Sequence, residues 1–155
     1  RDSELRKYIN ETIYNALPSD LQSVITTTKV ISSHGTTEGE TNFETQDKLY
    51  LLSMEEIYED AASSNYAKWD PSIIWDTSVG TSRQLDYYKN LGVTKDNHSS
   101  AKKQYDGEDE DSTAWWFRSM DGSDAERIIV ISGSGNWDCF NSEGVSGISP
   151  AFRIA

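Results

Sequence analysis

The stretch from residue 133 to residue 141 carries the side chains best suited to holding a ligand. Its glycines free the backbone for turns, and the residues after them supply rings, amides and a carboxylate, which make adaptable contacts in binding loops. Because alternate side chains of a strand point to opposite faces, Trp137 and Cys139 should share one face, and Asn136, Asp138 and Phe140 the other. Ordinary hairpin packing is the alternative interpretation. The candidate ligand-binding residues are Asn136, Trp137, Asp138, Phe140, Asn141, Asp121 and Asp124.

Residue types that support metal binding or catalysis are present but poorly arranged. The acidic run at 106–111 offers the oxygen ligands that Ca²⁺ prefers, yet its spacing departs from the usual calcium loop, so we interpret it as solvated. His34 and His98 lie in polar stretches without a nearby nucleophile. Cys139 is the only cysteine, which rules out an internal disulfide and a thiolate metal site. We therefore predict no catalytic residue, no metal and no cofactor.

Composition restricts the class of protein further. The chain has 155 residues, which fits one domain over 1–155, and its net charge of -12 opposes contact with phosphate backbones. No run approaches the roughly 18 apolar residues of a membrane span. We expect neither a nucleic-acid partner nor membrane insertion. Five Trp, eight Tyr and four Phe predict a core built from large rings.

Three of those rings stand in consecutive positions, followed by an arginine. In a strand, Trp115 and Phe117 should point to one face and Trp116 to the other, so that at least one face belongs to the core. We expect Arg118 to lie over a ring or to pair with a buried carboxylate.

Periodicity and capping signals predict helices mainly in the first half of the chain. Apolar spacings of three and four predict a helix over 3–16, and Ser53 with Glu56 forms a capping box for another helix. The full set of predicted elements is a helix at 3–16, a short helix at 18–25, a strand at 26–31, an exposed loop at 32–46, a buried strand at 48–52, a helix from 53 to about 62, an irregular segment at 65–80, a helix at 82–90 capped by Gly92, and a polar stretch at 94–112.

Strand-like runs dominate the last third of the chain. Residues 115–119, 127–132 and 147–154 are apolar and are joined by loops rich in Gly, Ser, Asn and Asp. This order predicts an α+β fold in which helices pack beside a small twisted antiparallel sheet, formed mainly by the C-terminal third.

Several motifs, in order along the chain, resemble a bacterial domain family of unknown function. They are LRKYIN at 5–10, LPSD at 17–20, ITTT at 25–28, DKLYLLS at 47–53, WWFRS at 115–119 and GISPAFR at 147–153. The resemblance implies a C-type-lectin-like fold, shared with formylglycine-generating enzymes and with variable proteins of diversity-generating retroelements. It also implies a place in surface or repeat proteins of Gram-positive anaerobes. Ser149 replaces the family's usual arginine, and Met120-Asp121 its usual Pro-Gly.

The family usually has one or two strands before the first helix. We therefore expect that the chain lacks N-terminal strands of the full domain, and that residues 147–154 would otherwise have a bare edge. The oxidase activity of the formylglycine-generating relatives needs two cysteines, and the calcium tripeptides of sugar-binding lectins are absent. We therefore expect neither oxidase activity nor calcium-dependent sugar binding.

The sequence favours a noncatalytic, adhesin-like module of a bacterial surface or secreted protein. It would bind a protein or glycan through loops of its C-terminal half. Three alternatives stay open: a retroelement protein diversified within about 120–146, a structural spacer, and an enzyme that uses the acidic run with His98. Ligand and oligomeric state are not determined.

Overall fold

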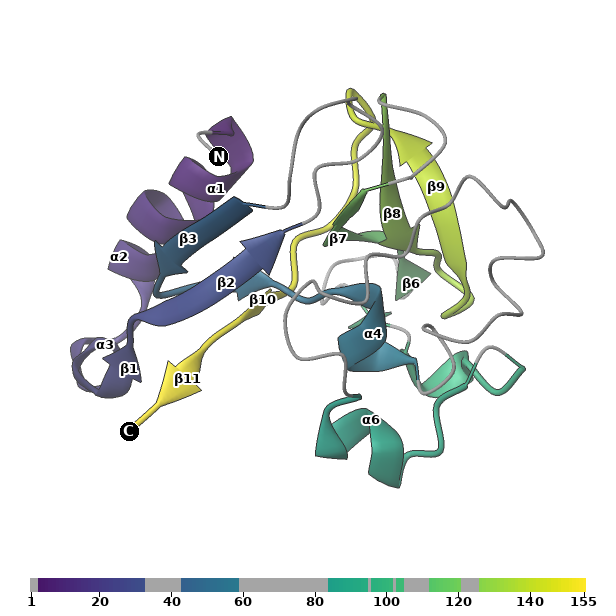
Figure 1. The fold of residues 1–155 in the computed structure, drawn as a ribbon, viewed down its shortest axis with the longest axis horizontal. Coiled ribbons are helices and arrows are strands. Elements are labelled where there is room, and N and C mark those ends of the chain that lie inside the picture. The colour runs from purple at the N-terminus through teal and green to yellow at the C-terminus, as the bar shows by residue number, and fades with distance from the viewer. Residues whose placement is uncertain are drawn as a thin grey trace.

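The computed structural model describes residues 3–32, 43–58, 84–94, 96–101, 103–104, 112–120 and 126–155. In this part the chain is a small mixed α+β domain, with few helices and several small antiparallel sheets (Figure 1). The predicted α+β class is confirmed. The predictions for 65–80, the acidic run 106–111, His34, Asp121 and Asp124 lie outside the described residues.

The N-terminal segment is helical, as its spacing predicts. It comprises α1 (Glu4–Lys7), a π-helical segment (Tyr8–Ile13) and α2 (Tyr14–Ala16), and the short α3 (Ser19–Val24) follows. The Ser3 hydroxyl caps the first turn by accepting from the Arg6 amide at 3.2 Å. Nothing in the apolar spacing predicted the π-helical segment, in which each turn holds an additional residue.

Three pairs of short strands lie beside this helix. β1 (Ile25–Thr26) pairs with β11 (Arg153–Ile154), β2 (Thr28–Ser32) with β3 (Phe43–Asp47), and β4 (Tyr50–Leu51) with β10 (Pro150–Ala151), all antiparallel. Residues 150–151 and 153–154 therefore each have a strand partner. The expected exposed loop at 32–46 is wrong for Ser32, which ends β2, and for residues 43–46, which belong to β3. The polar composition of β3 concealed it, because Asp47 is buried through an ion pair with Arg6.

The central sheet comes from the C-terminal third, as expected. Its order is β7 (Trp115–Met120), β8 (Arg127–Ile131) and β9 (Trp137–Asn141), with an irregular register between Trp116 and Met120. Two further short strands, β5 (Lys103–Gln104) and β6 (Ser112–Thr113), pair with each other.

Two short helices and a turn complete the described part. In α4 (Met54–Ile57), a Glu56 carboxylate oxygen accepts from the Ser53 amide at 2.8 Å, which is half of the predicted capping box. α6 (Asp86–Asn90) is followed by Gly92 with φ of 64°, so the predicted glycine cap is confirmed. A 3₁₀ turn spans Ser99–Ala101. None of the helices in the described ranges has the length and apolarity needed to cross a membrane.

Two hydrophobic cores lie on opposite faces of the central sheet. The first core holds Trp115 and Phe117, with ring centroids 5.3 Å apart, and the second holds Trp116. The predicted alternation of these three rings is confirmed. The first core consists of Leu52, Met54, Ile57, Tyr58, Tyr88, Val93, Ala101, Trp115, Phe117, Ile129 and Ile131. The second consists of Ile9, Ile25, Leu49, Leu51, Trp116 and Val130, with eight partly buried side chains around it.

Candidate functional site

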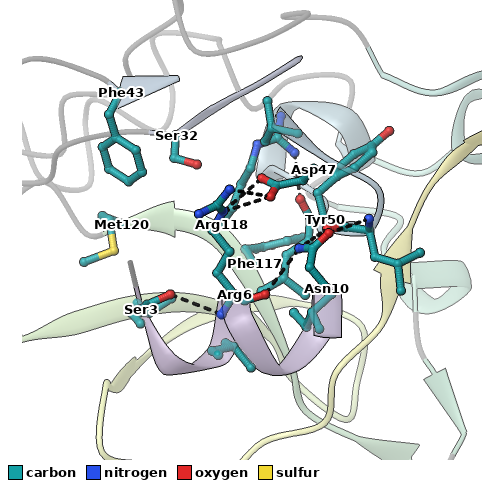
Figure 2. Close-up of a pocket in the computed structure, with 16 residues that line it drawn as sticks. Ser3, Arg6, Asn10, Ser32, Phe43, Asp47, Tyr50, Phe117, Arg118 and Met120 are labelled. Carbon is teal, nitrogen blue, oxygen red and sulfur yellow. Dashed lines mark hydrogen bonds and ion pairs between the residues drawn. The ribbon is translucent and has the colours of Figure 1, made fainter. Parts of the chain in front are cut away.

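A half-open cavity of about 350 Å³ lies between the N-terminal helix, the β2–β3 hairpin and β7; we name it the apolar cavity (Figure 2). Its volume is in the range of small-ligand pockets. The apolar lining consists of Leu5, Ile9, Val30, Phe43, Leu49, Tyr50, Leu51, Phe117, Met120 and Ile128. The polar lining consists of Ser3, Arg6, Asn10, Ser32, Asp47 and Arg118. An apolar interior with a few polar groups is the usual composition of a binding pocket.

The carboxylate that lines this cavity is already neutralised. Arg6 Nε donates to both oxygens of Asp47, at 2.9 and 3.1 Å, and Arg6 Nη2 lies 2.7 Å from Asp47 Oδ1. The Thr45 hydroxyl donates a further hydrogen bond to Asp47 Oδ2 at 2.5 Å. Because Asp47 is engaged on both oxygens, it is poorly placed to serve as a general base.

Asn10 attaches the helix to the chain between β3 and β4. Its Oδ1 accepts from the amides of Lys48 and Leu49 at 3.0 and 3.1 Å, and its Nδ2 donates to the Leu49 carbonyl at 2.9 Å. Nδ2 also donates to the Arg6 carbonyl at 3.2 Å. Asn10 lies within the π-helical segment, and such segments occur often at functional sites. Its amide therefore holds one wall of the apolar cavity in place.

Arg118, which also lines the cavity, joins three elements. Its Nε donates to the Ile31 carbonyl at 3.1 Å, and its Nη1 donates to the Leu51 carbonyl at 2.8 Å and to Glu56 Oε2 at 2.5 Å. The guanidinium also lies over the Tyr50 ring, 5.8 Å from the centroid. Both expectations for Arg118, a ring and a buried carboxylate, are confirmed.

A second cavity of about 290 Å³ also has Arg118 in its lining; we name it the cationic cavity. It shares Val30, Tyr50 and Arg118 with the apolar cavity. Its remaining lining residues are Thr28, Lys29, Ile31, Glu56 and Arg153. Three side chains of this lining are cationic and one is anionic, so the two neighbouring cavities differ in chemical character.

The predicted binding residues on β9 follow the expected alternation. Trp137 and Cys139 are half-buried against the first core, whereas Phe140 packs against the second, with its ring edge-on to Trp116 at 6.5 Å. The polar members Asn136, Asp138 and Asn141 are exposed. We name these three the β9 rim.

Two side chains of the β9 rim also stabilise local backbone. Asp138 Oδ1 accepts from the Cys139 amide at 2.8 Å, and Asn141 Oδ1 accepts from the Glu143 amide at 3.0 Å. The rim is thus an exposed polar surface on a well-anchored strand, and two of the predicted rings beside it serve partly as core.

Sequence reasoning missed most residues of the apolar cavity. Arg6 and Asn10 lie about forty residues before their partners Asp47 and Leu49, which they meet only through tertiary contacts. The available signal was the set of ordered motifs, because LRKYIN, DKLYLLS and WWFRS each contribute lining residues, and Arg118 of WWFRS belongs to both cavities. His98 lines neither cavity. Among the described residues, no three His, Cys, Asp or Glu side chains gather in a way that could hold a metal ion.

The described residues form a small α+β domain with two neighbouring cavities. A family model described as Domain of unknown function (DUF6273) matches residues 1–155, so the chain belongs to this family. No curated protein and no solved structure matches the chain.

Proposed function

We propose that this domain is a noncatalytic, adhesin-like binding module of a bacterial surface or secreted protein. The apolar cavity is the observation that carries the proposal. Its volume suits one apolar group of a protein or glycan partner, and burying such a group against Leu5, Phe43 and Ile128 would supply the hydrophobic part of the affinity.

The charges around the apolar cavity favour a neutral apolar group. Arg6 is neutralised by Asp47 and Arg118 by Glu56, so neither carboxylate is available as a base and neither pair leaves a net charge. The same pairing supports binding over acid–base catalysis, which needs a carboxylate free to exchange its proton. The exposed amides and carboxylate of the β9 rim give this domain a second surface that could contact the partner.

We further propose that the fold is C-type-lectin-like. In support, β11 pairs with β1, the first strand among the described residues, and lectin-like domains close by pairing their N- and C-terminal strands (Figure 1). A crystal structure with the same strand order as a lectin-like domain would test this assignment.

Ligand selection followed by site-directed variants tests the binding function. The folded domain is screened on a glycan array and against a displayed peptide library, and each ligand selected is titrated by calorimetry. Ser32→Phe places a ring in the apolar cavity without removing any hydrogen bond of the described residues. It should weaken binding by about tenfold or more, which corresponds to at least about 1.4 kcal/mol.

The matched comparison is a triple alanine variant of the β9 rim. Loss of binding in this variant with unchanged binding in Ser32→Phe would move the site from the cavity to the rim. A folded domain that selects no ligand from either library would favour the spacer alternative and contradict the proposal.

A further inference from the structure

We propose that the cationic cavity is a carboxylate-binding subsite, which recognises an acidic sugar or a peptide carboxylate. This inference names the ligand chemistry of the binding module proposed above and rests on that function. It concerns a different cavity from the apolar one, with its own variants, so the two proposals can fail separately.

The local charge is the first observation. The chain carries 26 acidic and 14 basic residues, yet Lys29, Arg118 and Arg153 converge on this cavity with Glu56 as the one carboxylate in its lining. Glu56 balances Arg118 and Glu44 pairs with Lys29, so the charge of Arg153 is left uncompensated among the described residues and gives the cavity a net positive charge. A positive cavity in a strongly acidic protein selects for an anionic group at short range.

The second observation is the burial and hydrogen bonding of the Arg118 guanidinium. Its side chain is only 9% exposed, and its Nε and Nη1 are fixed by Ile31, Leu51 and Glu56. Its Nη2 makes no hydrogen bond within the described part of the chain. A rigid guanidinium with two unused N–H groups is a preorganised donor for a carboxylate oxygen.

The third observation is that the other two cations are available to a ligand. The exposed Arg153 side chain has no ion pair or hydrogen bond among the described residues, while its backbone is fixed by pairing with Thr26. Lys29 Nζ contacts Glu44 at 2.5 Å, but both side chains are more than half exposed. A ligand carboxylate can replace such an exposed partner at little cost.

The test is an NMR titration of the isotope-labelled domain with small carboxylates and their neutral counterparts. Glucuronate is compared with glucose, and acetyl-trialanine with its C-terminal amide. We expect shifts at the Lys29 and Arg153 amides and at the Arg118 Nε–H signal with at least one carboxylate.

Arg153→Gln should weaken that binding by about tenfold, the effect of losing a charge-assisted hydrogen bond. The control is Lys89→Gln, which removes the same positive charge from an exposed side chain of α6 outside the cavity lining. It should leave the binding unchanged.

The two arms identify the source of the carboxylate. Binding of glucuronate alone assigns the subsite to an acidic glycan, and binding of the free peptide alone assigns it to a peptide. The proposal is overturned if neither carboxylate shifts these signals at millimolar concentration, if the neutral counterparts bind equally well, or if Arg153→Gln and Lys89→Gln have the same effect. None of these results depends on the apolar cavity, which Ser32→Phe tests independently.

Discussion

The two faces of the central sheet are packed to different extents. On the face of Trp115, the first core is closed, and Met54, Ile57 and Val93 are all 0% exposed. On the face of Trp116, several side chains associated with the second core, among them Ile9 and Ile128, line the open apolar cavity, which Phe117 of the first core also lines. Both faces are formed by alternate residues of the same strands, so the difference comes from the elements that cover them.

The covering elements explain this contrast. α4 and the residues after α6 bring small and medium-sized apolar side chains directly onto the first face. The second face is covered by the N-terminal helix and the segment between β3 and β4, which are held together by polar contacts of Arg6 and Asn10 (Figure 2). Polar attachment keeps these elements in place without filling the space between them. The closed face therefore supplies stability, and the open face has room for a ligand.

The largest effect should follow from truncating the ring on the closed face. Trp115→Ala should reduce the free energy of unfolding by about 3–5 kcal/mol, because it leaves a void in a fully packed core. Trp116→Ala on the open face should fall toward the lower end of that range, since its neighbours can relax more easily. Urea unfolding of both variants measures the difference. A loss below about 1 kcal/mol for Trp115→Ala would contradict its assignment to the core.

The next effect concerns the buried ion pair between Arg118 and Glu56. Glu56→Gln keeps the shape but leaves the guanidinium charge without its partner, and the side chains are only 9% and 5% exposed. We expect a loss of about 3 kcal/mol in unfolding free energy, as is typical when one partner of a buried pair is removed. Denaturant unfolding at neutral pH measures it, and an unchanged midpoint would show that the pair is not stabilising.

Titration of a tyrosine in the first core gives a smaller, pH-dependent effect. Burial, with a further contribution from Tyr87, raises the pKa of Tyr88 from 10.0 to about 12. The folded state then holds this proton more tightly than the unfolded state, so stability should fall as the pH rises from about 10 to about 12. Comparing unfolding of the wild type and Tyr88→Phe at pH 9 and pH 11 measures this. An equal decline in both proteins would assign it to other groups.

The smallest effect should come from the exposed ion pair of Lys29 and Glu44. Both side chains are more than half exposed, so Glu44→Gln should change the unfolding free energy by less than about 1 kcal/mol. The same variant frees Lys29 for a ligand, so carboxylate affinity at the cationic cavity should stay equal or rise. A clear loss of affinity in the NMR titration would argue against the role proposed for Lys29.

Local signals in the sequence predicted local structure well. The helix over 3–16, the helix start at Ser53 and the cap at Gly92 follow from interactions among residues close in sequence. The alternation of Trp115, Trp116 and Phe117 is a geometric property of any strand, so their two faces could also be assigned.

Hidden polar contacts limited the remaining predictions. Residues 43–46 of β3 were expected to be loop because the stretch 32–46 is rich in Gly, Thr and Glu, and the strand is stabilised by the contact of its last residue, Asp47, with Arg6, 41 residues away. The run at 147–154 was expected as one strand, but it divides into β10 and β11 because two different partners pair with it.

By itself, the sequence determined the α+β class, the C-terminal sheet and the environment expected for Arg118. Only the tertiary structure decided that Arg118 lines both an apolar cavity and a cationic one, and that side chains around the second core leave an open cavity. The physical reason is that helices, caps and strand faces depend on neighbours in the chain. A cavity is the space left between side chains that are far apart in sequence, and no local pattern encodes it.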